Sequence, residues 1–501
     1  MIKFVAIKSA RSFGRCHNCR RRKKSCDKQT PRCSSCVQRN IECVYPDKRT
    51  HARPSVASRS MCEVINSQLL PQRPLDPLNT MLNDVERQYL HNVKQYVLSS
   101  VKHHQALKFL LPLAHDNRPV LYALCSWGAS LRPEDFSKGS SLLLKSMRLC
   151  NQLYGEVVKS EVNVSQQKLL ELVASLTSHV IVGSSIGSSF AWGSNFFKLC
   201  IVYKKFGLRA LKENPTNTDF TTWLLRSFFY HDVLKLTSRR NSKTAFPLSE
   251  YKRILDHENS LKGEVSMDQY NPLMGCCVEL FLLLAELNNF YDEYSRRVEA
   301  VFEYYNRLNP LLDTNDTNAQ YEIITGPEYL EYESARIEFH DWLDNQSRTL
   351  MDKITSAKPN LPNIASLEDV QQNEILLTYF EATQVTLQLF LLSKIRRMSS
   401  LDYEVKGLML HLFSAMRVLL NSSLNPYLSF PLLIAGVVAA ERHDRLTVKM
   451  LYLGILSRSG ETNIQRIWTI IEELWKLNPD GNRHLDWQSV IDQLGYNICV
   501  W

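Results

Sequence analysis

The sequence has few glycines and no long apolar run. It holds 17 glycines in 501 residues, of which 44% are hydrophobic, and this composition favours packed structure. The longest nearly uncharged apolar stretch, residues 427–440, contains Pro431 and is shorter than the roughly 20 residues that a membrane-spanning helix needs. Near the start, only a four-residue apolar run stands between two lysines, too short for an export signal. We therefore expect neither a membrane span nor secretion.

Six of the thirteen cysteines form a doubled Cys-x2-Cys-x6-Cys unit, made of Cys16, Cys19, Cys26, Cys33, Cys36 and Cys43. In a reducing compartment, clustered cysteines more often bind metal than form disulfides. One tetrahedral zinc takes four ligands, so six thiolates hold two ions if two of the thiolates bridge. We predict two zinc ions per chain, with Cys16 and Cys33 as the bridging pair because each begins one unit. Cys-x2-Cys alone is also compatible with a redox motif, and four cysteines with a zinc ribbon.

Positive charge is concentrated at one end of the chain. Residues 1–53 hold fifteen Lys and Arg against three acidic residues, a net charge of +12, whereas the whole chain carries +9, so the other 448 residues carry −3. A compact cationic segment on a near-neutral body is the pattern expected for a polyanion partner such as DNA. A solvated basic tail would give the same local charge.

Five consecutive cations follow the second cysteine: Arg20, Arg21, Arg22, Lys23 and Lys24. Like charges on one helical turn repel each other, so such a turn needs an external clamp. Two divalent ions with six thiolates carry a net −2, which offsets part of that repulsion. The cations then project outward toward phosphates and toward the guanine edges that Arg and Lys favour. A zinc-stabilised structural module with no nucleic-acid role explains the cysteine ligands equally well, but it does not explain these cations.

Residues 15–46 resemble the zinc binuclear cluster (Zn2Cys6) of fungal transcription factors. The matching residues are Cys-Arg-Arg-Arg-Lys at 19–23, Cys26-Asp27, and Thr-Pro-Arg-Cys at 30–33. The resemblance implies that the first short helix enters the major groove, often at a CGG triplet, with Arg22 and Lys23 at the contact and Lys23 the better candidate for bases. It also implies that Pro31 turns the loop between the halves. Ser25 departs from the lysine usual at that position, which removes one expected phosphate contact.

The chain after the cluster is polar and marked by prolines at 54, 71, 74 and 77. We predict four parts: a flexible basic start at 1–14, the cluster at 15–46, a linker at 47–80 and a large domain at 81–501. The linker's apolar residues do not continue as heptads, so no coiled coil is expected there. The sequence does not decide whether a homodimer forms through the large domain.

The large domain is predicted to be all-helical, so the fold class is mostly α. Apolar residues recur at helical spacing from residue 81 onward, most clearly at Ile464, Ile467, Trp468, Ile471, Leu474 and Trp475. Four segments resemble the fungal-specific regulatory domain that accompanies such clusters: residues 223–239, 271–287, 430–445 and 467–487. The other tryptophans in the domain, such as Trp192, Trp223 and Trp487, are expected to be core anchors rather than a cofactor box.

Residues 183–187, Gly-Ser-Ser-Ile-Gly, match the G-x-S-x-G pattern of serine hydrolases and raise the competing hypothesis of an enzyme. That chemistry needs Ser185 on a sharp turn between a strand and a helix in an α/β sheet. Residues 179–182 could pass for a strand, but no alternating strand and helix series surrounds them. We therefore expect no catalytic residues, and the serine hydrolase is a remote alternative.

Residues 313–333 hold six acidic residues, three tyrosines and no Lys or Arg. Their composition favours a solvated loop, although such a segment could also contact the transcription machinery.

Together these features predict a nuclear, zinc-dependent regulator of RNA polymerase II transcription that binds double-stranded DNA. We expect it to control metabolic genes and to respond to a small-molecule effector or a protein partner. The alternative is a DNA-bound scaffold of the kinetochore or chromatin type that uses the same cluster. The sequence does not distinguish an activator from a repressor.

Overall fold

A computed structural model describes the chain as two compact units, residues 1–72 and 73–501. The described residues are 16–22, 26–27, 32–41, 43, 82–98, 104–159, 164–211, 218–235, 243–256, 273–312, 316–360, 370–459, 462–481 and 483–496. None of these is in a β-strand, and most are helical, so the mostly α fold class is confirmed. The predicted boundaries near residues 14, 46 and 80, and the linker itself, lie outside the described residues.

In the first unit, the described residues include two short helices, α1 (His17–Arg21) and α2 (Ser34–Val37). The second unit begins with α5 (Asp84–Leu98), α6 (His104–Leu113), α7 (Arg118–Ser130), η2 (Pro133–Asp135), α8 (Phe136–Lys159), α9 (Gln166–Ser185), α10 (Ser189–Phe206), α11 (Thr218–Leu234) and α12 (Leu248–Asp256). It continues with η5 (Gly275–Cys277), α13 (Val278–Leu312), α14 (Thr317–Thr325), α15 (Pro327–Ser356), α17 (Val370–Phe390), the π-helix η6 (Leu391–Ile395), α18 (Tyr403–Leu419), η7 (Asn425–Leu428), α19 (Ser429–Val438), α20 (Arg442–Ser459), α21 (Thr462–Leu477) and α22 (Trp487–Gln493).

Helix α9 is the centre of the first half of the large domain. Ser165 caps its start by accepting a hydrogen bond from the Lys168 amide at 3.3 Å. Every residue from Leu172 to Ser185 is buried, as expected for a helix that is apolar or small on all sides. Helices α7, α8, α10 and α11 pack around it.

Helix α17 has the corresponding role in the second half, where it packs against α15, α18 and α19. Together with η6 it forms an apolar stretch, Val370–Ile395, that is long and apolar enough to cross a membrane by length and composition alone. The expectation that residues 427–440 are the longest apolar stretch is therefore wrong. Two-thirds of its apolar window is buried inside the protein. A buried core helix passes the same test, and the packing around α17 identifies it as one.

The tryptophans named in the sequence are largely buried. Trp192, Trp223, Trp468 and Trp487 are at most 8% exposed, which confirms their role in the core. Trp475 is only partly buried; its indole donates a hydrogen bond to the Gly436 carbonyl at 2.9 Å.

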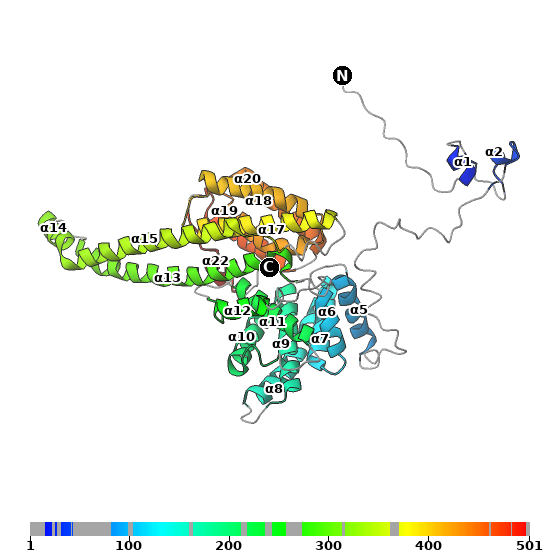
Figure 1. Cartoon of the computed structure of the whole chain (residues 1–501), viewed down its shortest axis with the longest axis horizontal. Coiled ribbons are helices and arrows are strands. Elements are labelled where there is room, and N and C mark those ends of the chain that lie inside the picture. Colours follow the sequence, from blue (N-terminus) through cyan, green and yellow to red (C-terminus); the bar gives the residue numbers. More distant parts are fainter. Residues whose placement is uncertain are drawn as a thin grey trace, which may run out of the picture. The chain divides into compact units, whose positions relative to one another are not determined.

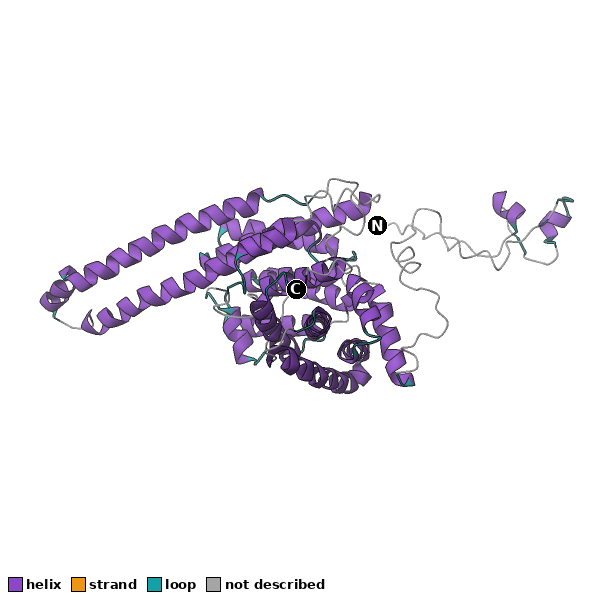
Figure 2. Cartoon of the chain, turned by 60° about the horizontal axis from the view of Figure 1, so that its bottom comes forward, coloured by secondary structure: helices purple, strands orange, loops and turns teal. Residues whose placement is uncertain are grey.

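Helices α13 and α15 form an arm. They run side by side away from the rest of the domain, with α14 at the far end (Figures 1 and 2). Aromatic pairs join the two long helices: Phe290 with Trp342, Tyr294 with Phe339, and Tyr305 with Tyr332, at ring-centroid distances of 5.3, 6.0 and 6.3 Å. Helix α14 has no buried residue, and the buried residues of α15 are Ser347, Leu350 and Ile354, near its end.

The acidic segment at 313–333 is helical where it is described, so the expectation of a solvated loop is wrong in conformation but correct in exposure. Asp316 caps α14 by accepting a hydrogen bond from the Asn318 amide at 2.9 Å. Gly326 ends α14, and Pro327 begins α15. The segment is the tip of the arm.

We expect the Gly128→Ala substitution to destabilise the large domain. A Cβ atom at Gly128 would lie 1.8 Å from the carbonyl oxygen of Tyr89, so α5 and α7 must separate. Overpacking of this kind costs about 1–3 kcal/mol, and the full-length protein should unfold at a lower temperature. In the control Gly155→Ala, the new Cβ has no atom within 4 Å, and replacing a mid-helix glycine stabilises by about 0.5–1 kcal/mol. Equal unfolding temperatures for the two variants would contradict the close approach of α5 and α7.

A buried histidine should make stability depend on pH. His179 is fully buried on α9 with its Nε2 2.6 Å from Ser146 Oγ, and burial lowers its pKa from 6.5 to about 3. The unfolded chain therefore binds a proton between these values that the folded protein excludes, so stability is intact above pH 6.5 and falls as the pH drops below it. Between pH 7 and pH 5 this single group costs about 2 kcal/mol.

Chemical unfolding at the two pH values measures this effect. In His179→Gln the loss between pH 7 and pH 5 should shrink by about 2 kcal/mol. His411→Gln, at an exposed histidine, should behave like the unchanged protein. If His179→Gln kept the full pH dependence, His179 would not be the titrating group.

Candidate metal centre and nucleic-acid interface

The doubled sequence unit gives a doubled local structure. Cys16 directly precedes α1, and Cys33 is the N-cap of α2. In each half, a short helix places the second cysteine of the unit, Cys19 or Cys36, within one turn of the first. The N–H of Cys19 donates to Cys16 Sγ at 3.4 Å, and the N–H of Cys33 donates to Cys43 Sγ at 3.2 Å. Backbone donors thus point at the sulfurs and stabilise negative charge on them.

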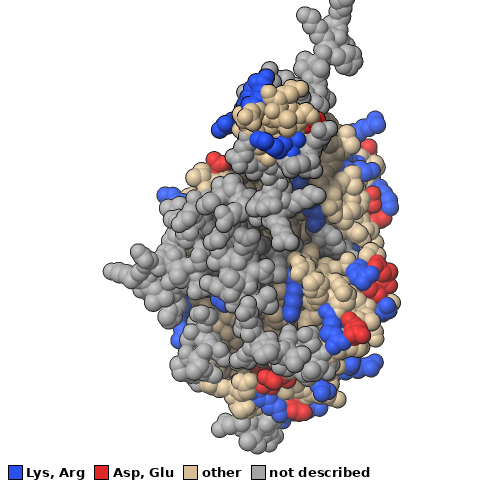
Figure 3. Space-filling view, turned by 90° about the vertical axis from the view of Figure 1, so that its right-hand side faces the viewer, with Lys and Arg blue, Asp and Glu red and all other residues tan. Residues whose placement is uncertain are grey.

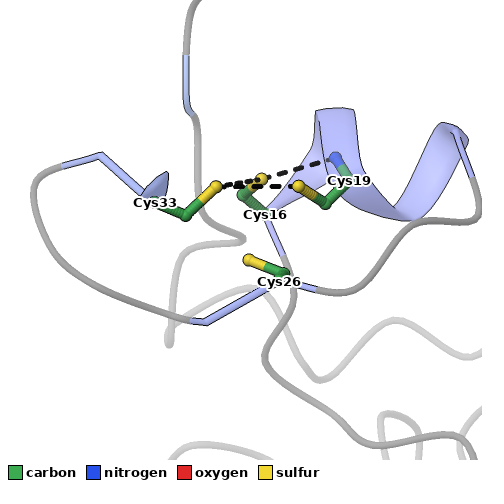
Figure 4. Close-up of side chains that lie close together, drawn as sticks. All are labelled: Cys16, Cys19, Cys26 and Cys33. Carbon is green, nitrogen blue, oxygen red and sulfur yellow. Dashed lines mark hydrogen bonds between the residues drawn. The ribbon is translucent and has the colours of Figure 1, made fainter. Parts of the chain in front are cut away.

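The six cysteines converge as two groups of four. One group consists of Cys16, Cys19, Cys26 and Cys33, and the other of Cys16, Cys33, Cys36 and Cys43, with the sulfurs of each group within 4.8 Å of one another. Figure 4 shows the first group with its sulfur atoms turned toward a common centre. The two groups share Cys16 and Cys33, the pair predicted to bridge.

The distances fit tetrahedral zinc. Four sulfurs at about 2.3 Å from a central ion lie about 3.8 Å apart. Cys16 Sγ lies 3.8 Å from Cys33 Sγ and 3.6 Å from Cys36 Sγ, and Cys19 Sγ lies 3.6 Å from Cys33 Sγ. Two ions with a shared pair of sulfurs therefore match both the number and the spacing of the thiols.

Burial and hydrogen bonding shift the pKa values of the cluster thiols. In the protein alone, burial is the main cause that raises the pKa values of the Cys16, Cys33 and Cys36 thiols. The Cys43 thiol has a lowered pKa, chiefly because it accepts the hydrogen bond from the Cys33 amide. Zinc binds the thiolate form, so metal binding at this site releases protons.

Two further contacts tie the loops of the module. The Asp27 carboxylate accepts hydrogen bonds from the Ser34 backbone N–H, at 3.1 and 3.2 Å, and from the Ser34 hydroxyl. The Arg32 guanidinium donates to the Ile41 carbonyl at 3.0 Å. Asp27 thus joins the end of the first unit to the start of α2. No local spacing in the sequence links Asp27 to Ser34, so this contact could not be predicted from the residues alone.

The predicted DNA-contacting cations begin on α1. Arg20 and Arg21 belong to the helix and Arg22 follows it, with the side chains of Arg21 and Arg22 exposed. Asn18 Oδ1 accepts a hydrogen bond from Arg21 Nη2 at 3.3 Å. Lys23, Lys24, Ser25 and Pro31 lie outside the described residues.

Figure 3 shows Lys and Arg side chains, in blue, on the small module near the top of the view, whereas blue and red side chains alternate along the right-hand edge of the large domain. The module's described surface is therefore mainly cationic, which suits a polyanion.

Ser185, the candidate nucleophile of the hydrolase hypothesis, does not lie on a strand-to-helix turn. Ser185 is the last residue of α9, and it is 3% exposed. No described strand precedes it, and Gly183 lies inside the helix, where its Cα packs against the backbone of Trp192. The pair Ser146 and His179 is also fully buried. Neither serine can meet a substrate, so the G-x-S-x-G match does not form a hydrolase site.

Comparisons with known proteins agree with this site. Residues 15–52 match the fungal Zn(2)-Cys(6) binuclear cluster domain, and residues 87–501 match the fungal specific transcription factor domain. The uncharacterized transcriptional regulatory protein C965.10 of Schizosaccharomyces pombe is 23% identical, with 99% of this chain and 98% of that protein covered. The transcriptional activator protein UGA3 of Saccharomyces cerevisiae is 21% identical, with 96% of both proteins covered. No solved structure matches the chain.

The paired cysteine groups, the cationic helix beside them and the match over nearly the whole chain lead to one conclusion. The chain is a non-enzymatic, DNA-binding protein whose cluster domain binds two zinc ions, and it belongs to the family of fungal transcription regulators that combine a Zn(2)-Cys(6) cluster with a fungal specific transcription factor domain.

Proposed function

We propose that the chain is a zinc-dependent, nuclear regulator of RNA polymerase II transcription that recognises CGG-type triplets and controls metabolic genes. One observation carries the proposal: two four-cysteine groups share Cys16 and Cys33 directly beside the cationic helix α1. The zinc ligands are Cys16, Cys19, Cys26, Cys33, Cys36 and Cys43. In this proposal residues 15–46 form the DNA-binding domain, 47–80 the linker and 81–501 the regulatory domain.

The cluster positions α1 for the major groove. Arg20, Arg21, Arg22, Lys23 and Lys24 would contact DNA, with Lys23 at the bases and the others chiefly at phosphates. An arginine or lysine reads guanine through O6 and N7, which fits a GC-rich triplet. Pro31 turns the loop that returns the chain to α2.

The arm supplies a surface for the transcription machinery. Near its tip, Tyr321 and Leu330 are 69% and 59% exposed, and residues 313–333 carry six acidic side chains with no Lys or Arg. Such a surface fits a partner with a basic rim around apolar pockets, because it offers both charge complementarity and apolar anchors.

A DNA-bound scaffold would use the same cluster. The match of residues 87–501 to a transcription factor domain favours the regulator. Genome-wide occupancy distinguishes the two functions: a regulator binds many promoters, whereas a scaffold binds a few specialised loci.

Zinc should be required for the module to fold. We expect the native protein to contain two zinc atoms per chain, and Cys→Ala at any of the six positions to unfold residues 15–45 and abolish specific DNA binding, because metal binding supplies the folding free energy of so small a unit. Elemental analysis after gel filtration, with fluorescence anisotropy on labelled DNA, measures both effects. The control Cys125→Ala, at a buried cysteine of the large domain, should keep two zincs. Fewer than two zincs in the native protein would contradict the proposal.

Lys23 and Lys24 should contact different parts of the DNA, Lys23 the bases and Lys24 the phosphates. We expect Lys23→Ala to weaken binding to a CGG-containing duplex by about 1–3 kcal/mol and to weaken non-specific binding much less. In contrast, Lys24→Ala should weaken both and lower the salt slope by about one. Titrations at several salt concentrations, on a CGG duplex and a scrambled duplex, measure this. Equal losses on the two duplexes for both variants would remove the base-reading role of Lys23.

A further inference from the structure

The large domain contains a cavity of about 270 Å³ between α13, η6, α20, α21 and the segment before α22. This volume is far larger than one water molecule requires and suits a small metabolite. The charges of the lining are strongly unbalanced: its described residues include Lys394, Arg397, Arg445 and Arg483, and Asp486 is the one carboxylate among them. These charges sum to +3, in a part of the chain that is otherwise slightly acidic.

Lys394 and Arg445 are held in the wall of the cavity, whereas the other two cations are exposed at its rim. The Lys394 side chain is 6% exposed; it pairs with Asp486, and its ammonium lies 4.4 Å from the ring centroid of Trp487. Arg445 is half-buried and donates to the carbonyls of Ala439, Asn478 and Pro479 at 2.6–3.2 Å, so its charge is fixed by neutral acceptors. Both cations are thus preorganised in the wall of the cavity.

Two backbone irregularities lie at the same place. Residues 391–395 form a π-helix, with the Arg396 N–H bonded to the Leu391 carbonyl at 3.0 Å; such turns occur frequently at functional sites. Arg397 has φ of +53°, a left-handed conformation that costs a non-glycine residue roughly 1 kcal/mol. Strain of this kind tends to persist where it serves a ligand site. Here it places Arg397 in the cavity lining, while Arg396 pairs outside it with Asp344 at 3.0 Å.

Aromatic and apolar side chains form much of the rest of the lining, together with the polar residues Ser393, Ser400 and Asn478. Trp475, Trp487 and Tyr291 contribute rings, and Val437 and Leu474 contribute aliphatic surface. His484 also lines the cavity, and its pKa is lowered chiefly by burial and in addition by the charge of Arg397. Apolar walls with a few convergent charges are typical of a small-molecule site.

We propose that this cavity binds a small organic anion, with a carboxylate or phosphate group at Arg397 and Arg483 and its carbon skeleton against Trp475 and Trp487. That the bound anion serves as the effector of the regulator rests on the proposed function; binding itself does not.

Tryptophan fluorescence tests the proposal, because Trp475 and Trp487 line the cavity. The full-length, zinc-loaded protein is titrated with succinate, 2-oxoglutarate, glutamate, glucose 6-phosphate and inorganic phosphate. We expect at least one organic anion to give a saturable change in fluorescence and to raise the unfolding temperature. The carboxylates and the sugar phosphate separate the two anion classes. No saturable binding by any organic anion, or binding by inorganic phosphate alone, would overturn the proposal.

Variants locate the site. Arg397→Gly removes the charge and relieves the left-handed strain, so we expect at least tenfold weaker binding of the anion with no fall in the unfolding temperature of the free protein. Arg483→Gln should also weaken binding at least tenfold. The matched control Arg396→Gln, at the neighbouring arginine that faces Asp344, should bind the anion normally. Undiminished binding by Arg397→Gly and Arg483→Gln would overturn the proposal.

DNA binding is measured on the same preparations. If the unchanged protein bound the CGG duplex but no organic anion, the result would count only against the cavity, whereas anion binding by the unchanged protein without specific DNA binding would count only against the proposed function.

Discussion

The sharing of Cys16 and Cys33 between two four-cysteine groups is the constraint on which the DNA-binding module depends. In the described part of the module, the buried core consists of cysteines, with Ile41 packed against it. No aliphatic cluster of ordinary size replaces them there. Bound zinc would therefore supply the cohesion that hydrophobic burial supplies in a larger domain. The same coordination would hold α1, because Cys16 directly precedes this helix and Cys19 lies within it.

The large domain is built on the opposite principle. Its helices bury a continuous apolar core around α9 and α17, and its polar interior groups are mostly paired at short range. Asp232 is one example: it is fully buried and accepts hydrogen bonds from the Tyr251 hydroxyl at 2.5 Å and the Ala245 amide at 2.7 Å. The cavity follows the same rule at its buried cation, since Lys394 pairs with Asp486, whereas Arg397 and Arg483, which carry most of the excess positive charge, are exposed at its rim.

Sequence reasoning succeeded where the signal is local. The cysteine spacing is short and repeated, so the convergence of Cys16 with Cys33 could be predicted, and helical periodicity predicted the fold class. It failed at residues 313–333, because composition reports exposure and does not distinguish a loop from a helical tip capped by Asp316. The cavity could not be predicted at all: its lining extends from Tyr291 to Trp487 over several separate elements, and no spacing rule connects them. The DNA-contacting roles of Lys23 and Lys24 stay predictions, because both residues lie outside the described residues.

The turn around η6 links the two special features of the large domain. Arg396 and Arg397 are adjacent, yet the first pairs with Asp344 on α15 of the arm and the second lines the cavity. On the opposite side, Tyr291 and Tyr294 line the cavity from α13, the other long helix of the arm. Tyr291 and Tyr294 therefore belong both to α13 and to the wall of the cavity, and the residue next to Arg397 binds α15. Because Arg396 and Arg397 are neighbours in this turn, a rearrangement that moved Arg397 would also disturb the ion pair between Arg396 and Asp344 of α15.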